Sequence, residues 1–145
     1  KVAATHQIPV YCLGAAPGVA QRAIDNVSAQ VGALNIAGIH DGFFDSAEEQ
    51  EIIKSIAESK AKLVFVALGV PKQEQWIAEK LSHLDGVVAI GIGGSFDVLA
   101  GNIPRAPEWM QQNRLEWLYR LYLEPQRIGR MLAIPKFMWT VIRNK

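Results

Sequence analysis

The chain has 145 residues, half of them hydrophobic and a fifth charged, so it can bury a core without disulfide bonds. Its single cysteine, Cys12, cannot form an internal disulfide and lies in an apolar run, where a buried, inert thiol is expected. The first residues lack the apolar core of a signal peptide, and no window reaches the ~18 consecutive apolar residues of a membrane span. We therefore expect neither a disulfide-stabilised secreted domain nor a protein that crosses a bilayer.

Charged and aromatic residues are unevenly distributed along the chain. Residues 1–104 carry 7 Lys and Arg against 11 Asp and Glu, whereas residues 105–145 carry 8 against 3. A basic, aromatic tail on an acidic body predicts contact with an anionic membrane surface or with phosphate. No nucleic-acid partner is expected. Six of the twelve aromatic residues fall in the final stretch: Trp109, Trp117, Tyr119, Tyr122, Phe137 and Trp139.

The first hundred residues alternate between strand and helix patterns. The opening segment, 1–7, resembles the end of a helix. Apolar strands that are each followed by a helix are typical of an α/β fold, here a Rossmann-like parallel sheet with helices on both faces. Buried strands are predicted at 8–14, 34–39, 63–68 and 87–92. Helices are predicted at 17–31 with Pro17 in the first turn, from Ser46 with Glu49 completing a capping box, and at 71–84.

The pattern changes after Gly101. Residues 107–143 contain no strand pattern and are predicted to form helices that break at Pro125. The predicted organisation is therefore an α/β domain over 1–104, incomplete at its N-terminus, and a helical, basic and aromatic appendage over 105–145 that docks on a membrane. One side of these helices is apolar, and the other is basic, with Arg114, Arg120, Arg127, Arg130 and Lys136.

Each predicted strand ends in small or polar residues. Because ligands of open parallel sheets bind outside the carboxyl ends of the strands, these four ends predict a phosphate or nucleotide site. Glycine lets the main chain approach a ligand closely, and helix N-termini present free N–H groups to anions. Taken alone, each turn is equally compatible with a tight strand-to-helix connection. The four ends lie at 14–18, 38–42, 69–73 and 91–97.

Other patterns carry less information. The three histidines, His6, His40 and His83, lack metal-ligand spacing, so no metal site is expected. The sequence contains neither a Walker motif nor the GxGxxG fingerprint. Asp41 and Asp45 precede a capped helix and are expected in a turn. Trp76 is expected in the core.

Three ordered blocks resemble a known family. They are ALGVPKQEQW at 67–76, GIGGSFDVLAG at 91–101 running into RAPEW at 105–109, and LEWLYRL at 115–121 followed by EPQR at 124–127 and Arg130. The chain is similar over nearly all its residues to the WecG/TagA/CpsF family of bacterial glycosyltransferases. The resemblance implies transfer of N-acetylmannosamine, or a related sugar, from a UDP-sugar to undecaprenyl-diphosphate-linked N-acetylglucosamine. It also implies inversion at the anomeric carbon, no metal or other cofactor, and a peripheral position at the inner face of the plasma membrane.

The resemblance also implies roles for individual residues. Gln73 would lie beside the donor diphosphate and the reacting sugar carbon, the 93–97 turn would hold the uracil end, and the turn with His40 and Phe43 would lie near the ribose. The tail arginines would close over the site and stabilise the charge that gathers on the departing UDP. The nucleotide-contacting set is Gly14, His40, Phe43, Gly69, Gln73, Gly93, Gly94 and Asp97, and the catalytic set is Gln73, Arg120, Arg127 and Arg130.

The family's proposed catalytic base is an aspartate in a segment ahead of the residues matched here. None of this chain's aspartates lies in that motif, so the chain alone is expected to be inactive. Two alternatives stay open: a non-catalytic nucleotide-binding module with a membrane-docking tail, and a dinucleotide-dependent oxidoreductase. The lack of an acidic residue closing the second strand argues against the latter. A homo-oligomer is compatible with the sequence, which sets no number of subunits.

Overall fold

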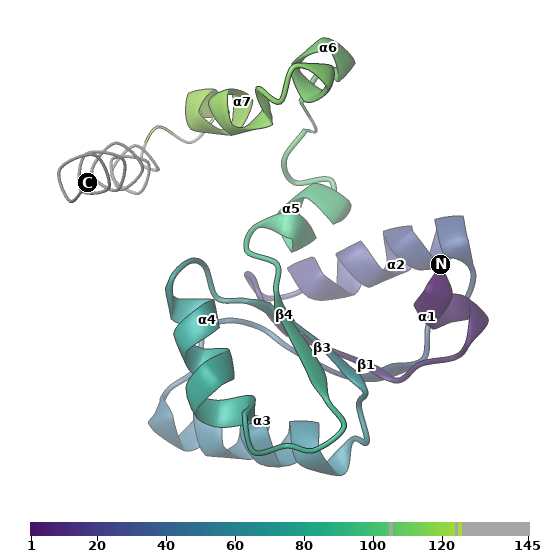
Figure 1. The fold of residues 1–145 in the computed structure, drawn as a ribbon, viewed down its shortest axis with the longest axis vertical. Coiled ribbons are helices and arrows are strands. Elements are labelled where there is room, and N and C mark those ends of the chain that lie inside the picture. The colour runs from purple at the N-terminus through teal and green to yellow at the C-terminus, as the bar shows by residue number, and fades with distance from the viewer. Residues whose placement is uncertain (105, 124, 126–145) are drawn as a thin grey trace, which may run out of the picture. The chain divides into compact units, whose positions relative to one another are not determined.

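A computed structural model describes residues 1–104, 106–123 and 125. The chain divides into two compact units, 1–104 and 105–145. Figure 1 shows the elements of the first unit, which alternate along the chain as the sequence predicts. They are α1 (Val2–Thr5), β1 (Val10–Gly14), α2 (Val19–Val31), β2 (Ile36–His40), α3 (Ser46–Glu58), β3 (Leu63–Ala67), α4 (Lys72–Trp76), the π-helical turn η1 (Ile77–Leu81), β4 (Val88–Gly91) and α5 (Ser95–Leu99).

The four strands form one sheet in the order β2-β1-β3-β4, and each neighbouring pair is parallel. This confirms the predicted α/β class. The central strand β1 is buried along its whole length, whereas β2 and β4 lie at the two edges of the sheet. The order of the strands in the sheet differs from their order in the chain, because β2 lies on one side of β1 and β3 lies on the other side of β1.

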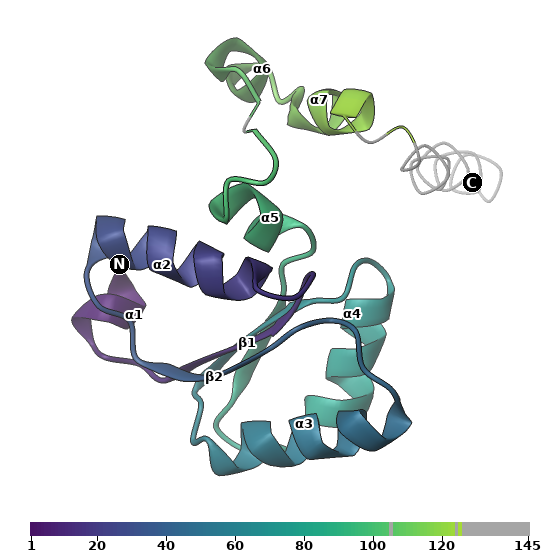
Figure 2. The same cartoon turned by 180° about the vertical axis from the view of Figure 1, so that it is seen from behind.

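Helices pack against both faces of the sheet (Figures 1 and 2). On one face, Ile52 and Ile56 of α3 and Trp76 of α4 enclose a core with Leu13 and Val64 of the strands. The opposite face has its own core, in which α2 and α5 cover β1. Its buried residues are Val10, Cys12, Val19, Ala20, Ala23, Ile24, Ala67 and Phe96. Trp76 and Cys12 are therefore core residues, as predicted.

The start of α3 corrects one prediction. Asp45, not Ser46, is the N-cap, and its carboxylate accepts the N–H groups of Ala47 and Glu48 at 2.8 and 2.9 Å. Glu48, not Glu49, completes the capping box by accepting the N–H of Asp45 at 3.0 Å. The prediction was displaced by one residue because Asp and Ser are both good N-caps and stand side by side.

Two further boundaries differ from the prediction. Helix α2 begins at Val19 with Gly18 as its N-cap, so Pro17 lies in the preceding turn. The single helix predicted at 71–84 is a short α-helix followed by a π-helical turn. The periodicity of apolar residues does not distinguish these two helix types over so few turns.

The predicted burial of β4 is wrong. The strand pairs with β3, but Val88 and Ile90 are 59% and 43% exposed. Its apolar sequence correctly indicated a strand, and a parallel strand is normally covered on both faces. Here two side chains typical of an interior strand are left partly in contact with water.

The described part of the second unit contains two short helices, α6 (Glu108–Gln112) and α7 (Glu116–Leu123). They confirm the helices predicted for this part of the tail. Trp109 and Leu118 are exposed, and Tyr122 is 81% exposed. Among the residues that the structure describes, no helix is long and apolar enough to span a membrane.

Candidate functional site

The carboxyl ends of the four strands lie along one edge of the sheet, because all strand pairs are parallel. The order β2-β1-β3-β4 places the topological switch point between β1 and β3, where the loops after these strands lead in opposite directions. Ligand sites of open α/β sheets form at this point. The loops predicted to bind a nucleotide therefore occupy the position that the fold class favours.

Main-chain hydrogen bonds join the ends of β1, β2 and β3. The N–H of Ala15 donates to the carbonyl of Ala67 at 3.0 Å, and the N–H of Gly42 donates to the carbonyl of Ala15 at 2.8 Å. Gly14 adopts a φ of +121°, and a Cβ at this position would overlap the main chain of Ala67. Only glycine adopts this φ readily and has no Cβ to overlap with Ala67. Gly14 therefore allows the end of β1 to lie directly against the end of β3.

Gln73 links the loop after β3 to the loop after β4. Its side chain is only 3% exposed. Its Oε1 accepts the N–H of Gly93 at 3.0 Å, and its Nε2 donates to the Glu74 carboxylate at 2.8 Å. The main-chain N–H of Gln73 donates to the carbonyl of Gly69 at 2.9 Å. A Cβ on Gly91 would come within 2.6 Å of Nε2, so the glycine leaves room for the buried amide.

The turn after β4 leads directly into α5. The Ser95 hydroxyl donates to the carbonyl of Ile92 at 2.6 Å. In the first turn of α5, the Asp97 carboxylate accepts from Nδ2 of Asn102 at 3.3 Å, and Arg22 donates to Oδ1 of Asn102, also at 3.3 Å. Asp97 is therefore connected to α2 through Asn102. The predicted Gly93–Asp97 turn is held by Gln73 at one end and by this chain of contacts at the other.

The end of the edge strand β2 forms the outer corner of this edge of the sheet. The N–H of Phe43 donates to the Asp41 carboxylate at 2.8 Å, which confirms the predicted turn role of this aspartate. His40 Nδ1 lies 3.0 Å from the Asp41 carbonyl. The Phe43 ring is 73% exposed, whereas the Phe44 ring meets His40 edge-on at 6.0 Å and lies 5.5 Å from Nζ of Lys72. The corner thus contacts the first residue of α4.

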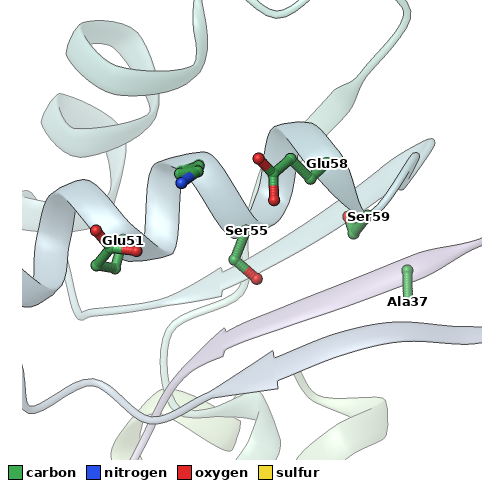
Figure 3. Close-up of a pocket in the computed structure, with 6 residues that line it drawn as sticks. Ala37, Glu51, Ser55, Glu58 and Ser59 are labelled. Atoms are coloured by element: carbon green, nitrogen blue, oxygen red, sulfur yellow. The ribbon is translucent and has the colours of Figure 1, made fainter.

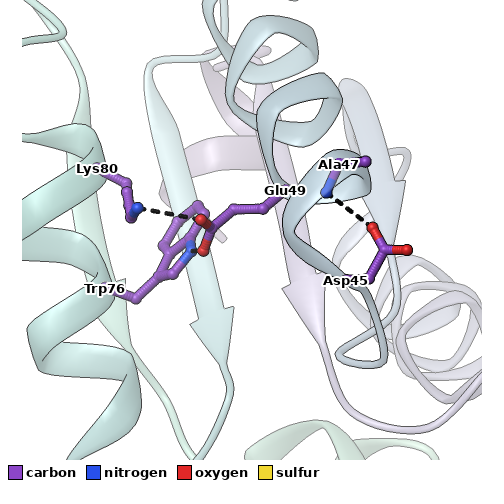
Figure 4. A network of polar contacts seen from close by, with 5 residues as sticks. All are labelled: Asp45, Ala47, Glu49, Trp76 and Lys80. Carbon is purple, nitrogen blue, oxygen red and sulfur yellow. Dashed lines mark hydrogen bonds and ion pairs between the residues drawn. The ribbon is translucent and has the colours of Figure 1, made fainter.

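Glu49 joins α3 to α4 and η1 (Figure 4). Its carboxylate accepts from Trp76 Nε1 at 2.8 Å and pairs with Nζ of Lys80 at 3.0 Å. The hydrogen bond from Lys80 is the main cause that lowers the pKa of Glu49, and partial burial opposes it. Because Trp76 and Gln73 share helix α4, this contact helps to fix the helix that carries Gln73.

Comparison with known proteins identifies the family. The model of the family described as Glycosyl transferase WecG/TagA/CpsF matches residues 1–145. The chain belongs to the WecG/TagA/CpsF glycosyl transferase family. A relative from Bacillus subtilis (strain 168) is 40% identical over 136 residues, which cover 94% of this chain and 52% of the relative. A relative from Staphylococcus aureus (strain NCTC 8325 / PS 47) is 34% identical over 145 residues, which cover all of this chain and 56% of the relative.

Both relatives carry the name N-acetylglucosaminyldiphosphoundecaprenol N-acetyl-beta-D-mannosaminyltransferase. A third relative of that name, from Bacillus spizizenii (strain ATCC 23059 / NRRL B-14472 / W23), is 42% identical over 137 residues. The chain spans about half the length of the curated relatives it matches.

In this member of the WecG/TagA/CpsF family, the structure places the predicted nucleotide-contacting residues in two groups. The first group lies at the ends of β1, β3 and β4: Gly14 is the last residue of β1, Gly69 and Gln73 follow β3, and the Gly93–Asp97 turn follows β4. In the second group, His40 is the last residue of the edge strand β2 and Phe43 follows it. Arg120 lies in α7 of the second unit, and Arg127 and Arg130 lie outside the described residues. Whether any of these residues binds a ligand stays a prediction.

Sequence reasoning missed the residues that support Gln73 in this WecG/TagA/CpsF member. Glu49 was assigned to a capping box, and Phe44 and Lys72 were given no role. The bond between Gln73 and Gly93 joins residues 20 positions apart, so no local pattern signals it. The signal that could have been used is the polar side chain of Glu49 on a helix face otherwise occupied by Ile52, Ile53 and Ile56.

Two cavities of the first unit lie away from the strand ends. One, of about 360 Å³, lies between α3 and β2, where Ser55 and Ala37 face it (Figure 3). The other, of about 280 Å³, is almost entirely apolar and lies on the α2 and α5 face, with Cys12 in its wall. The predicted burial of Cys12 is confirmed, and this burial raises the pKa of its thiol to about 12, which disfavours the reactive thiolate. In the described part of the chain, no three His, Cys, Asp or Glu residues form a group that could hold a metal ion.

Proposed function

We propose that this chain forms the donor-binding part of an inverting glycosyltransferase. The enzyme moves N-acetylmannosamine, or a related sugar, from a UDP-sugar to undecaprenyl-diphosphate-linked N-acetylglucosamine. The observation that carries this proposal is the similarity to relatives named for that sugar and that acceptor, at 34–42% identity over 94–100% of the chain. The product would serve the synthesis of a cell-wall or surface polysaccharide.

The edge formed by β1, β3 and β4 is the proposed donor site. Nε2 of Gln73 carries two hydrogens, and its bond to Glu74 uses one of them, so the second can donate to a phosphate or sugar oxygen. Gly14, Gly69 and Gly93 all adopt positive φ values, which side-chain-bearing residues rarely reach. The main chain can therefore come close to a diphosphate at this edge. The turn that contains Gly94 and Asp97 would hold the uracil.

The chemical step that the chain would support is the departure of UDP from the sugar, because its residues would stabilise this leaving group. When the glycosidic bond of the UDP-sugar breaks, both electrons leave with the β-phosphate oxygen. The oxygen of the acceptor hydroxyl forms the new bond from the opposite side of the sugar, and its proton passes to a general base, a role that we assign to none of this chain's aspartates. Guanidinium groups beside that phosphate would stabilise its growing negative charge. We assign this role to Arg120, Arg127 and Arg130. No metal or other cofactor takes part in the proposed step.

Residues 105–145 would dock on the inner face of the plasma membrane, where the lipid-linked acceptor lies. The exposed aromatic side chains of Trp109 and Tyr122, together with the basic composition of this unit, support the proposal. Aromatic and basic residues are the usual components of peripheral membrane contacts. Arginines that reach the donor only after docking would limit hydrolysis of the UDP-sugar in solution.

Calorimetric titration of the 145-residue chain with UDP and with NAD tests the donor assignment. We expect saturable heat with UDP and none with NAD at the same concentrations. Binding of NAD without binding of UDP would contradict the transferase and favour a dinucleotide-dependent enzyme. In a polypeptide of the relatives' full length, Arg120→Ala should lower turnover of UDP-N-acetylmannosamine with a lipid-diphosphate acceptor, whereas Arg114→Ala should not. Binding of UDP without turnover in that longer polypeptide would indicate a non-catalytic module.

A further inference from the structure

Part of the sheet is left uncovered where β3 and β4 run side by side. The register pairs Leu63 with Val88 and Phe65 with Ile90. Paired residues of parallel strands point to the same face, and Leu63 and Phe65 belong to the face on which α2 and α5 pack. Val88 and Ile90 therefore point to this face as well, yet both are exposed. The other face of the same strands is covered by α4 and η1.

The outer edge of β4 is equally unusual. Within the described residues, β4 pairs with β3 alone, so the N–H and C=O groups on its other side have no strand partner. Edge strands are normally protected from pairing by a charged residue, a proline or a bulge. Residues 86–96 contain no charged residue and no proline. The sequence of β4 is therefore that of an interior strand.

The exposed surface continues into the apolar cavity on the same face. Phe65, Ile92 and Leu99 line this cavity of about 280 Å³, and Leu99 is exposed. We call Phe65, Val88, Ile90, Ile92 and Leu99 the open face. An apolar surface that joins a cavity and an unpaired strand edge is typical of a protein interface, because burial removes apolar area from water.

The curated relatives contain polypeptide that could cover the open face. This chain spans only 52–56% of their length, so a stretch of comparable size lies outside the matched part. A lipid could cover the apolar side chains but could not pair with the main chain of β4. A polypeptide segment can meet both requirements, because a strand beside β4 pairs with its main chain and the residues that adjoin the strand can cover the side chains of the open face. We infer that the open face is the docking surface for the polypeptide that corresponds to the rest of the relatives' length, with a strand added beside β4.

A chimera that has the full length of a curated relative tests the inference. In it, this chain replaces the 136 matched residues of the Bacillus subtilis relative, and amide hydrogen exchange is compared with that of the 145-residue chain. We expect the amides of Ala89 and Gly91, which point to the free edge of β4, to exchange roughly tenfold or more slowly in the chimera because they become paired there. The amides of Val88 and Ile92 already donate to the carbonyls of Lys62 and Val66, so their exchange should change little. Residues 10–14 of the central strand should be protected equally in both proteins, which verifies that the chimera folds. If the chimera does not fold, the unmatched part of the relative is added to the chain as a separate polypeptide and the same amides are measured.

A pair of matched substitutions provides a second measurement. Ile90 and Leu118 are 43% and 42% exposed, so lysine at either position should be tolerated in the 145-residue chain. In the chimera, Ile90→Lys should lower the Tm by about 5 °C or more, whereas Leu118→Lys should lower it by less than about 2 °C.

Three results would overturn the inference. The first is fast exchange of the Ala89 and Gly91 amides in a folded chimera or in the mixture. The second is slow exchange of the Ala89 and Gly91 amides in the 145-residue chain alone, which would mean that its own residues cover the free edge of β4. The third is a dimer of the 145-residue chain that Ile90→Lys dissociates in sedimentation experiments, because a second copy would then be the partner.

Discussion

The proposed binding surfaces of the two units differ in how their residues are held. In the first unit, the strand-end loops are fixed by long-range contacts: Gln73 is buried between two loops, and Gly14 lies against the main chain of Ala67. In the second unit, α6 and α7 expose Trp109 and Tyr122. A site that positions a small ligand depends on a few distances. A surface that contacts a membrane depends on exposure and charge, which tolerate looser geometry.

The largest effect is expected from a substitution that breaks the geometry of the first unit. Gly14→Ala combines a strained φ with an overlap on the main chain of Ala67. Gly32 also has a positive φ, but a Cβ added there would meet nothing within 4 Å, so Gly32→Ala measures the strain alone. We expect Gly32→Ala to cost about 1–3 kcal/mol and Gly14→Ala about 2 kcal/mol more, in urea unfolding followed by circular dichroism. Equal costs would show that the end of β1 is not tightly packed.

A pair of exposed aromatic residues can separate the functions of the two units. Phe43→Ser should weaken UDP binding severalfold and leave binding to anionic vesicles unchanged. Tyr122→Ser should weaken binding to anionic vesicles and leave UDP binding unchanged, because Tyr122 lies in the second unit. The two side chains are 73% and 81% exposed, so neither substitution should destabilise the fold. Calorimetry and vesicle co-sedimentation measure the two activities. Loss of both activities in either variant would contradict the assignment of UDP binding to the first unit and of vesicle binding to the second.

The smallest effect is expected at Glu49, which supports α4. Its carboxyl pKa is lowered in the folded state, so its stabilising contribution is complete above the unfolded pKa of about 4.5 and is lost as the pH falls through the lower folded value. Glu49→Gln should therefore reduce stability by about 1 kcal/mol or less at pH 7. The difference from wild type should shrink below about pH 4, as measured by thermal unfolding. A difference independent of pH would exclude the ion pair with Lys80 as its cause.

Sequence patterns predicted the strands and the sheet because parallel strands in a covered sheet are apolar throughout. The exposure of β4 could not be predicted, since its apolar residues are the same whether or not a partner covers them. The strand ends were recognisable from glycines and from the family motifs. The contacts among them were not, because the bond from Gln73 to Gly93 and the contact of Glu49 with Trp76 join distant residues. The helices α6 and α7 in the described part of the second unit were predictable from local periodicity alone.

The central claim is that Gln73 holds the donor site together, and UDP affinity measures it most directly. Gln75 lies on the same helix but is exposed, so Gln75→Ala is a matched control for Gln73→Ala. Calorimetric titration of the folded 145-residue chain should show UDP binding weakened roughly tenfold or more, about 1.4 kcal/mol, by Gln73→Ala and unchanged by Gln75→Ala. If Gln73→Ala binds UDP as tightly as the wild-type chain does, the donor does not bind at this edge of the sheet in the way proposed.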